Sequence, residues 1–382
     1  MSAAAPALHG KRIVFVVAWS VMGGAERNAL QVLLHFARHE GAEVEVLALT
    51  AEEGRFRTDL NVAGIPCHLY PVHWVGGKAR KMRTLAALAL RLRRLRPDVL
   101  MPYTTRPNVL CGLVWRLTGA SVYVWNQRDL SVSTKFSPEV VARSAGRSSL
   151  LIANSTAGRD YLVSRLGVNP HRIRVVPDTV ELPAPVMSRS EWRARYELPE
   201  GMVVATMLAH FHHGKDHDTV LHAWRHVVDR VGDGAVLLLA GRSAGTKDSA
   251  KALAYDLDLR SSVRFLEDVV DVAGLLAASD IGVLSSQSES APNALLESMA
   301  AGLPVAATDV PGIREILPPE QTTSLAPPRD AEALANVLVQ LIDDPNARER
   351  MGRRNAEHIA SRDDRPAGRG LAALLSAALE GK

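Results

Sequence analysis

Short runs of apolar, often β-branched residues recur along the chain, and helix-forming stretches separate most of them. Such runs are typical of parallel strands that are buried on both faces. Alternating strands and helices predict an α/β protein whose sheets are mostly parallel and covered by helices on both sides. The predicted strands are 12–18, 43–49, 67–71, 99–103, 122–125, 150–153 and 173–176, then 201–207, 236–240, 263–269 with its loop, a strand that ends the run 278–286, and 305–308.

The chain is long enough for two domains of ordinary size, since it has 382 residues. A Pro-rich segment at 177–185 has the composition of a linker. Residues 1–185 hold 24 Lys and Arg against 13 Asp and Glu, whereas the remainder holds 21 against 28. A basic first half (+11) and an acidic second half (−7) indicate two domains with different partners. We place the boundary after residue 183 and end the second domain at 360.

Composition excludes several classes of protein. No apolar run reaches the roughly 18 residues that a membrane helix needs. The first ten residues lack a basic start and a long apolar stretch, so we expect no signal peptide. Cys67 and Cys111 are too few for a disulfide framework or a four-thiolate metal site, which favours a reducing cytosol. We expect a cytoplasmic protein that does not bind nucleic acid.

The stretch 289–302 places two acids around the start of a helix. Glu289 follows an apolar run, Pro292 can begin a helix, and Gly302 can end it in a left-handed conformation. Glu297 then falls on the second turn. Backbone N–H groups at a helix N-terminus have no intrahelical partner and attract anions. Amides for a phosphate and acids for hydroxyls together suit a nucleotide sugar.

The residues from Glu289 to Glu297, the following Ser-Met-Ala-Ala-Gly-Leu-Pro-Val and the string Val-Pro-Gly-Ile-Arg-Glu ending at Glu315 resemble the retaining glycosyltransferases of family 4. This resemblance implies the GT-B fold, in which two Rossmann-like domains have parallel sheets facing a central cleft. It implies that Glu297 holds ribose hydroxyls and that Glu289 contacts the donor sugar. It also implies that a last helix, within 361–382, packs back on the acceptor-side first domain.

Other stretches extend the resemblance. The turn at Gly23 and Gly24 follows a strand and opens a helix, and in the family a similar turn lies beside the donor diphosphate. Lys215 matches the lysine of a basic pair, but His210 stands where the family has an arginine, and a neutral imidazole offers one donor where guanidinium offers five. Arg128 is a further candidate, either as an acceptor or phosphate contact or in a salt-bridged loop.

The predicted site therefore has two sets of residues. The catalytic candidates are Glu289, Lys215, His210 and Arg128. The donor-binding candidates are Gly23, Gly24, Lys215, Val269, Glu289, Ser290, Ala291, Asn293, Ala294 and Glu297, of which Val269 is expected near the base.

Six histidines raise the question of a metal, namely 210, 212, 213, 217, 222 and 226. No H-E-x-x-H pattern is present and neither cysteine is near them, so we expect neither a metal nor another cofactor.

The stretch 78–96 carries eight cations and no acid. Leu85, Leu88, Leu92 and Leu95 add an apolar stripe at helical spacing. Two interpretations stay open: a helix that lies on an anionic membrane surface, or a helix that faces the core and has a solvated basic side.

The leading hypothesis is a metal-independent, retaining hexosyltransferase. It would move a sugar from a UDP- or GDP-linked donor to a glycan or lipid-linked acceptor, at the inner face of the membrane if the basic helix docks there. The alternatives are a nucleotide-sugar epimerase with the same fold and a two-domain sugar-binding protein without catalysis.

Overall fold

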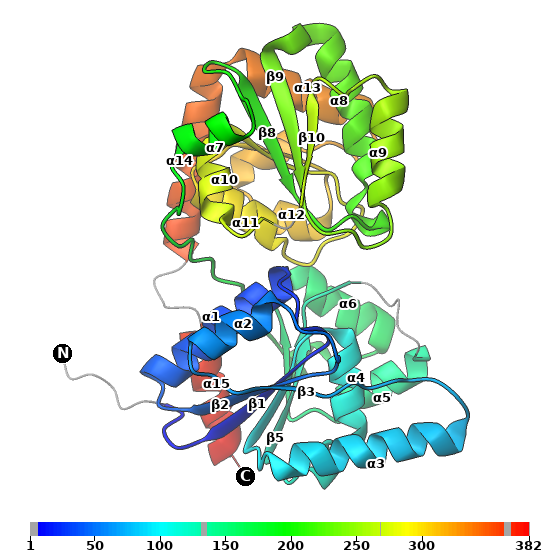
Figure 1. Cartoon of the computed structure of the whole chain (residues 1–382). Coiled ribbons are helices and arrows are strands. Elements are labelled where there is room, and N and C mark those ends of the chain that lie inside the picture. The colour runs from blue at the N-terminus through cyan, green and yellow to red at the C-terminus, as the bar shows by residue number, and fades with distance from the viewer. Residues whose placement is uncertain (1–6, 131–135, 268, 363–367, 382) are drawn as a thin grey trace, which may run out of the picture. The chain divides into compact units, whose positions relative to one another are not determined.

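The computed structural model describes residues 7–130, 136–267, 269–362 and 368–381. The chain divides into two compact units (Figure 1). Unit 1 comprises residues 1–179 and 365–382, and unit 2 comprises residues 180–364. The two units divide between Thr179 and Val180, inside the Pro-rich segment.

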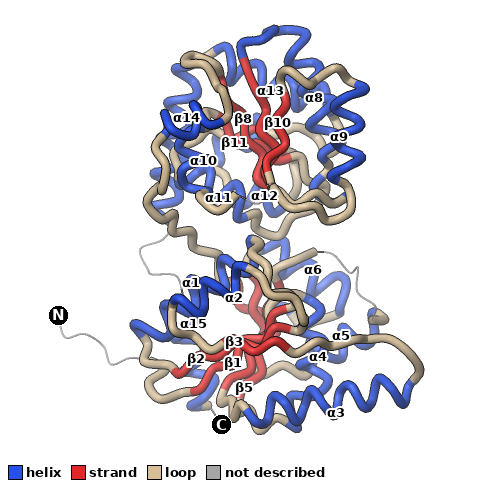
Figure 2. Tube along the Cα trace, in the orientation of Figure 1, coloured by secondary structure: helices blue, strands red, loops and turns tan. Residues whose placement is uncertain are grey.

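Unit 1 is built on a parallel sheet of seven strands in the order β3-β2-β1-β4-β5-β6-β7. Helices cover both faces of the sheet (Figure 2). Its strands are β1 (Arg12–Val17), β2 (Glu43–Ala48), β3 (Cys67–Leu69), β4 (Val99–Pro102), β5 (Val122–Gln127), β6 (Leu150–Ala153) and β7 (Ile173–Val175). Its helices are α1 (Gly24–His39), α2 (Arg55–Val62), α3 (Lys78–Arg94), α4 (Thr105–Val114), η1 (Trp115–Leu117), α5 (Pro138–Gly146), α6 (Thr156–Leu166), η2 (Pro170–Arg172) and α15 (Arg369–Glu380).

Strand β1 shows why the runs in this unit are continuously apolar. Successive side chains point to opposite faces of a strand. Ile13, Phe15 and Val17 lie in the core on one side of the sheet, whereas Val14 and Val16 lie in the core on the other. Because helices cover both faces, every residue of the strand after the half-buried Arg12 is apolar and buried. Helix α15 completes the first of these cores, to which it contributes Leu371, Ala372 and Leu375.

Unit 2 has a parallel sheet of five strands in the order β10-β9-β8-β11-β12. Its strands are β8 (Val203–Leu208), β9 (Ala235–Ala240), β10 (Val263–Leu266), β11 (Ile281–Leu284) and β12 (Val305–Ala307). Its helices are α7 (Arg189–Arg195), η3 (His213–Lys215), α8 (His217–Val231), η4 (Gly232–Gly234), α9 (Lys247–Asp256), α10 (Val272–Ala278), α11 (Asn293–Ala300), α12 (Pro311–Ile316), η5 (Pro319–Ser324), α13 (Ala331–Asp343) and α14 (Pro345–Arg362). The two parallel α/β sheets confirm the predicted fold class.

Each sheet has one point at which the strand order reverses. In unit 2 the chain runs outward through β8, β9 and β10 and then returns to place β11 on the other side of β8. In unit 1 the reversal lies between β1 and β4. Ligands of open α/β sheets bind outside the carboxyl ends of the strands at such a switch point. The fold thus selects the loops after β8 and β11, and those after β1 and β4, as places for a site.

Helix α3 shows which way its leucine stripe faces. Its residues Leu88 and Leu92 are buried in the core of unit 1, together with Leu95, and Leu85 packs against them. The leucine stripe is therefore the core-facing side of the helix. A membrane could meet only the opposite face.

Candidate functional site

Lys215 and Glu289 come together at the switch point of unit 2. Lys215 ends the short helix η3, which follows β8, and Glu289 lies on the loop that follows β11. They are 74 residues apart in the chain, yet the Lys215 ammonium pairs with the Glu289 carboxylate and donates a hydrogen bond to its Oε1. The side chains are 24% and 11% exposed, so the pair remains open to solvent. The structure thus joins two of the four residues predicted to be catalytic.

The Glu289 carboxylate has a second donor. The hydroxyl of Ser286 donates to Oε1 at 2.6 Å. The backbone carbonyl of Ser286 accepts a hydrogen bond of 2.6 Å from the buried hydroxyl of Thr308, which follows β12. The carboxylate is therefore oriented by two donors, one of which is itself fixed to the neighbouring strand.

The Lys215 segment is fixed from the β11 side as well. The hydroxyl of Ser285 lies within hydrogen-bond reach of the carbonyls of Lys215 (3.1 Å) and Asp216 (2.8 Å), and Gln287 donates its N–H to the Gly214 carbonyl at 3.0 Å. Asp216 has a left-handed backbone (φ 53°) and caps α8, since its carboxylate accepts from Thr219. These contacts fix the direction in which the lysine leaves the backbone.

The loop that carries Glu289 is packed against α12. Gly312 lies so close that a Cβ placed there would be 2.2 Å from the carbonyl oxygens of both Glu289 and Ser290. No side chain larger than hydrogen fits this approach without moving the loop. At the other end of α11, Gly302 has φ +76° and closes the helix in the left-handed conformation expected from the sequence.

The remaining donor-binding candidates of this loop lie along the start of α11. Pro292 is the N-cap residue and the helix begins at Asn293, with Ala294 in its first turn. Ser290 is buried and Ala291 is half-buried just before it. Glu297 lies on the second turn and is only 5% exposed. The structure therefore places both acids around one helix N-terminus, with Glu289 the more accessible of the two.

Four histidines lie near Lys215 in sequence, namely 210, 212, 213 and 217, and three of them have clearly different surroundings. His210 follows β8 directly and is half-buried. His212 accepts the Gly214 N–H on Nδ1 at 3.1 Å, and burial together with the charge of Lys215 lowers its pKa, although Glu289 acts in the opposite direction. His217 is buried and stacks on Phe211 with the ring centroids 4.2 Å apart. Burial, followed by the charges of His212 and Lys215, also lowers the pKa of His217, so both His212 and His217 respond to Lys215.

Val269 is partly buried and packs against buried apolar residues of β10 and α10. It precedes α10, which begins at Val272 because the Asp271 carboxylate caps it by accepting the Gly274 N–H at 3.0 Å. Its role at the base stays a prediction.

Gly23 and Gly24 open α1 in unit 1, at the carboxyl end of β1. Gly23 is the N-cap residue, and the Glu26 carboxylate accepts its N–H as well as that of Glu26 itself. Burial raises the pKa of Glu26 to about 7, against the lowering effect of these N–H groups and of the Arg128 charge. The glycine turn thus brings a carboxylate that titrates near neutral pH to the start of α1.

Arg128 is buried in a polar cluster of unit 1. Its guanidinium pairs with Asp178, and the two side chains are 7% and 3% exposed. It lies over the Tyr103 ring, 5.0 Å from the centroid, and Asp178 also accepts from Asn154 at 2.9 Å. Burial alone would lower the pKa of Arg128, but Asp178 and Tyr103 raise it overall. The salt-bridged alternative describes its surroundings, and its catalytic role stays a prediction.

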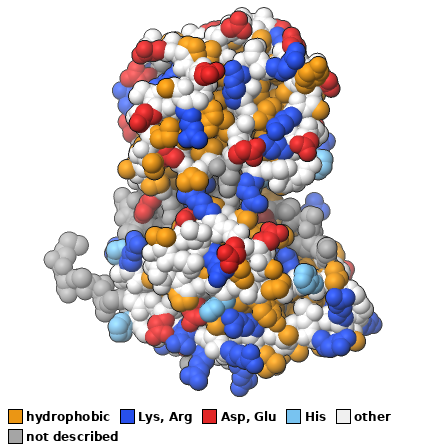
Figure 3. Space-filling model, viewed as in Figure 1, with side chains coloured by type: hydrophobic (Ala, Val, Ile, Leu, Met, Phe, Trp, Pro, Cys, Tyr) orange, Lys and Arg blue, Asp and Glu red, His pale blue; other side chains and the backbone are white. Residues whose placement is uncertain are grey.

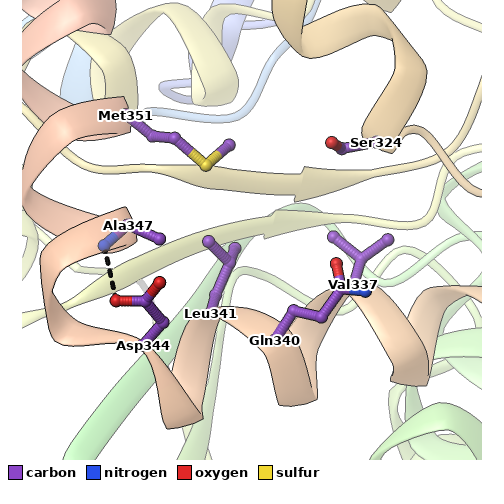
Figure 4. A pocket seen from close by; sticks show the side chains of 7 residues that line it. All are labelled: Ser324, Val337, Gln340, Leu341, Asp344, Ala347 and Met351. Atoms are coloured by element: carbon purple, nitrogen blue, oxygen red, sulfur yellow. Dashed lines mark hydrogen bonds between the residues drawn. The ribbon is translucent and has the colours of Figure 1, made fainter.

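A metal cluster and a second cavity are the other kinds of site to consider. In the part of the chain that the structure describes, no group of three or more His, Cys, Asp or Glu is arranged to hold a metal. A cavity of about 290 Å³ lies between α13, α14 and η5 (Figure 4). None of the predicted site residues lines it; its lining residues are Ser324, Val337, Gln340, Leu341, Asp344, Ala347 and Met351.

Comparison with known families assigns both units. Residues 188–358 match the family described as glycosyl transferases group 1, and residues 22–182 match the family described as glycosyltransferase family 4. Each match covers most of one unit. The chain therefore belongs to the group 1 glycosyltransferases, which confirms the family and the class of enzyme predicted from the sequence.

Individual relatives agree with this assignment. A D-inositol 3-phosphate glycosyltransferase of Kineococcus radiotolerans is 31% identical over 60% of this chain and 56% of its own length. An Escherichia coli UDP-Gal:alpha-D-GlcNAc-diphosphoundecaprenol alpha-1,3-galactosyltransferase is 24% identical over 69% of this chain and 71% of its own length. The chain spans about half the length of the first of these relatives.

Solved structures support the fold. Anabaena HepE, crystallised with UDP and glucose, superposes with a TM-score of 0.81 at 20% identity and covers 96% of this chain and 100% of its own. WaaG, a glycosyltransferase of lipopolysaccharide biosynthesis, superposes with a TM-score of 0.70 at 18% identity, covering 97% of this chain and 100% of its own.

Three residues of the site were not predicted from the sequence: Ser286, His212 and Gly312. Ser286 and His212 each lie three residues from a predicted residue. No sequence pattern around them separates them from ordinary loop residues. Gly312 stood inside the string that carries the family resemblance, but its close approach to Glu289 is a tertiary contact.

Proposed function

We propose that the protein transfers a hexose from a UDP- or GDP-linked donor to an acceptor hydroxyl, with retention of anomeric configuration and without a metal ion. Unit 2 binds the donor and unit 1 the acceptor. The observation that carries the proposal is the Lys215–Glu289 pair at the switch point of unit 2, next to the N-terminus of α11.

The pair suits a nucleotide-sugar donor because the ammonium matches its diphosphate and the carboxylate matches the hydroxyls of its sugar. In the structure the Lys215 ammonium is paired with the Glu289 carboxylate. A bound diphosphate competes for that ammonium. The Glu289 carboxylate, still held by the Ser286 hydroxyl, then becomes available to the hydroxyls of the sugar. Donor binding thus replaces one ion pair with two interactions that position the substrate.

The same groups favour bond breaking. When the bond between the anomeric carbon and the β-phosphate oxygen breaks, negative charge increases on the diphosphate. The Lys215 ammonium and the N–H groups at the start of α11 stabilise that charge more strongly than they stabilise the intact donor. A fixed cation and a helix N-terminus supply what a metal supplies in other transferases, and His210 adds one donor in place of the family's arginine. Glu289 stabilises positive character at the anomeric carbon.

The relatives support this choice of substrates. HepE was crystallised with UDP and glucose, and the name of the E. coli relative specifies a UDP-linked hexose and a lipid-linked acceptor. These ligands belong to those proteins, and we extend them to this chain as the classes to be tested first.

The experiment combines binding and turnover. A panel of UDP-, GDP- and ADP-sugars is screened by thermal shift, because a ligand of the native state raises the melting temperature. Turnover of the preferred donor is then measured for Glu289→Gln and Lys215→Met, each of which should fall at least about tenfold. Glu320→Gln is the matched control, since it breaks the exposed Arg354–Glu320 pair of unit 2, which is 2.8 Å long. Wild-type turnover in both site variants would refute the proposal, and the configuration of the product tests retention.

The acceptor side is proposed to meet an anionic membrane through α3. Its exposed side chains include Met82 (64%) and Leu90 (59%). Met82 is next to the exposed Arg83 in the chain, and Leu90 lies about two turns beyond Arg83. Lys and Arg side chains gather where α3 lies along unit 1 (Figure 3). In the described residues none of the cations of this stretch pairs with a carboxylate; they are Lys78, Arg80, Lys81, Arg83, Arg91, Arg93, Arg94 and Arg96. Unpaired cations around exposed apolar side chains suit anionic headgroups above an acyl boundary.

Vesicle sedimentation tests this part. We expect binding to vesicles with anionic lipid, little binding to neutral vesicles, and weakening by salt. Met82→Ser with Leu90→Ser should reduce binding, whereas Val62→Ser, at an 85% exposed position of unit 1, should not. Equal binding to neutral and anionic vesicles would remove the membrane from the proposal. No described helix of the chain has the length and apolar character to cross a bilayer.

A further inference from the structure

The switch point of unit 1 holds an aromatic and a cationic side chain. Trp19 follows β1 by two residues, and Arg106 lies in the first turn of α4, which follows β4. Because β1 and β4 are parallel neighbours, their carboxyl ends meet at one edge of the sheet. The Arg106 guanidinium carbon lies 5.8 Å from the centre of the Trp19 ring. The strand reversal at this edge makes it the place where an α/β sheet binds a ligand.

Trp19 is exposed and yet held in position. Its side chain is 48% exposed, which is unusual for the largest apolar residue in an otherwise well-packed unit. The next residue, Ser20, donates its hydroxyl to the Glu52 carbonyl. Gly54 packs so closely that a Cβ there would lie 2.5 Å from the Ser20 carbonyl oxygen. The start of α2 and the residues before it therefore hold the backbone next to Trp19 in place, and the exposed indole is presented from a fixed loop.

Arg106 carries a charge that the protein leaves uncompensated. The guanidinium is half-buried and donates to the Val72 carbonyl. Among the described residues, no carboxylate pairs with it. Its partial burial lowers its pKa, which means that the surroundings disfavour the cation. A cation in this state gains when an anion reaches it, and a guanidinium presents two parallel N–H donors that match a phosphate.

The two side chains select one ligand chemistry. An indole ring takes up the apolar C–H face of a saturated ring and leaves the hydroxyls outward. Arg106, whose guanidinium lies over one face of the Trp19 ring, can recognise an anionic group attached to a ring that packs on the other face. Burial raises the pKa of Glu26, at the start of α1, to about 7, so this carboxylate is about half protonated near neutral pH and opposes an anion less than a fully charged one would.

We propose that Trp19 and Arg106 form an acceptor subsite for a hydroxylated ring that carries a phosphate group. This inference rests on the proposed function, because it assigns the acceptor of the same reaction. A soluble sugar or polyol phosphate and a lipid-linked sugar diphosphate share this chemistry, and the experiment separates them.

The test measures binding to the full chain in the presence of UDP, by isothermal titration. The soluble probes are myo-inositol 1-phosphate and N-acetylglucosamine 1-phosphate, each compared with its unphosphorylated form, and the lipid probe is a farnesyl diphosphate carrying N-acetylglucosamine. We expect the wild type to bind a phosphorylated probe at least about tenfold more tightly than its unphosphorylated form, as one charge-assisted phosphate contact implies. Binding of the soluble or of the lipid probe identifies the source.

The variants assign the two roles. Arg106→Gln should abolish the preference for phosphate, and Trp19→Ala should weaken both forms by about tenfold. The controls are Arg260→Gln and Tyr255→Ala, which alter another exposed arginine–aromatic pair, 4.6 Å apart, at the opposite end of the strands of unit 2. UDP affinity should be unchanged in all four variants.

The outcomes are distinct. Equal affinity for phosphorylated and unphosphorylated probes, no binding of any probe by the wild type, or unchanged binding in Trp19→Ala and Arg106→Gln would each overturn the subsite. Failure of the wild type to bind either UDP or GDP would instead count against the proposed function.

Discussion

Replacing Gly312 with alanine tests how the site is positioned without touching a charged group. A Cβ at this residue would lie 2.2 Å from the carbonyl oxygens of Glu289 and Ser290, so ordinary contact at 3.4 Å requires a shift of roughly 1.2 Å. Both obstacles are backbone atoms, and no flexible side chain can move aside. The shift therefore passes to the loop that carries Glu289, or to α12, and separates the carboxylate from Lys215 and Ser286.

Two opposing effects decide the stability of Gly312→Ala. Alanine favours a helix over glycine by about 1 kcal/mol. Overpacking in a filled region destabilises by about 1–3 kcal/mol. We expect a net loss of about 1 kcal/mol and a much larger effect on turnover, because a displacement of about 1 Å at a reacting group can lower the rate by about 100-fold.

Turnover of the donor and thermal unfolding are measured together for Gly312→Ala. The matched control is Gly370→Ala, which also changes the second residue of a helix, α15, but whose Cβ would meet no atom within 4 Å. The control should be as active as the wild type and at least as stable. Wild-type turnover in Gly312→Ala, with the control behaving as expected, would refute the claim that this close approach positions Glu289.

Three further predictions follow from the site and its surroundings. Ser286→Ala removes one donor to Glu289 and should lower turnover by about tenfold while donor affinity changes less; an equal fall in affinity and turnover would mean that the serine only binds substrate. Activity should survive EDTA, and its complete loss with recovery on one specific metal ion would contradict the metal-independent mechanism. Burial lowers the pKa of His217 from 6.5 to about 3, so the unfolded chain takes up a proton below pH 6.5 that the folded chain refuses. The contribution of His217 to the free energy of unfolding is therefore fully present above pH 6.5 and should fall by about 1.4 kcal/mol per pH unit below it. Urea unfolding at pH 7.5 and at pH 5 measures this fall, which should vanish in His217→Phe.

Much of the architecture could be predicted because the evidence for it is local. A parallel strand buried on both faces is apolar throughout, so runs such as the one ending at Val17 stand out in the sequence. Elements with mixed composition were harder. Strand β5 continues through Asn126 and Gln127, two polar residues beyond the predicted end at residue 125. Asn126 can stay in the strand because the Asn108 side chain satisfies its backbone N–H (3.1 Å) and carbonyl (2.8 Å), a contact that sequence alone does not reveal.

The site shows the same division. Glu289 and Lys215 could be chosen because they occupy positions in recognisable strings. That they pair, that Ser286 orients the carboxylate and that Gly312 sets the loop are consequences of strand order, which brings the ends of β8, β11 and β12 together. Which face of α3 packs against the core depended on tertiary packing in the same way. An amphipathic pattern alone does not tell whether the apolar face meets a core or a membrane.

The binding position of a nucleoside diphosphate tests the central claim most directly. A crystal structure of the full chain with UDP or GDP should place the diphosphate at the N-terminus of α11, within hydrogen-bond distance of Lys215 Nζ, with the Lys215–Glu289 pair opened. A diphosphate bound elsewhere on the chain, with that ion pair intact, would contradict the account.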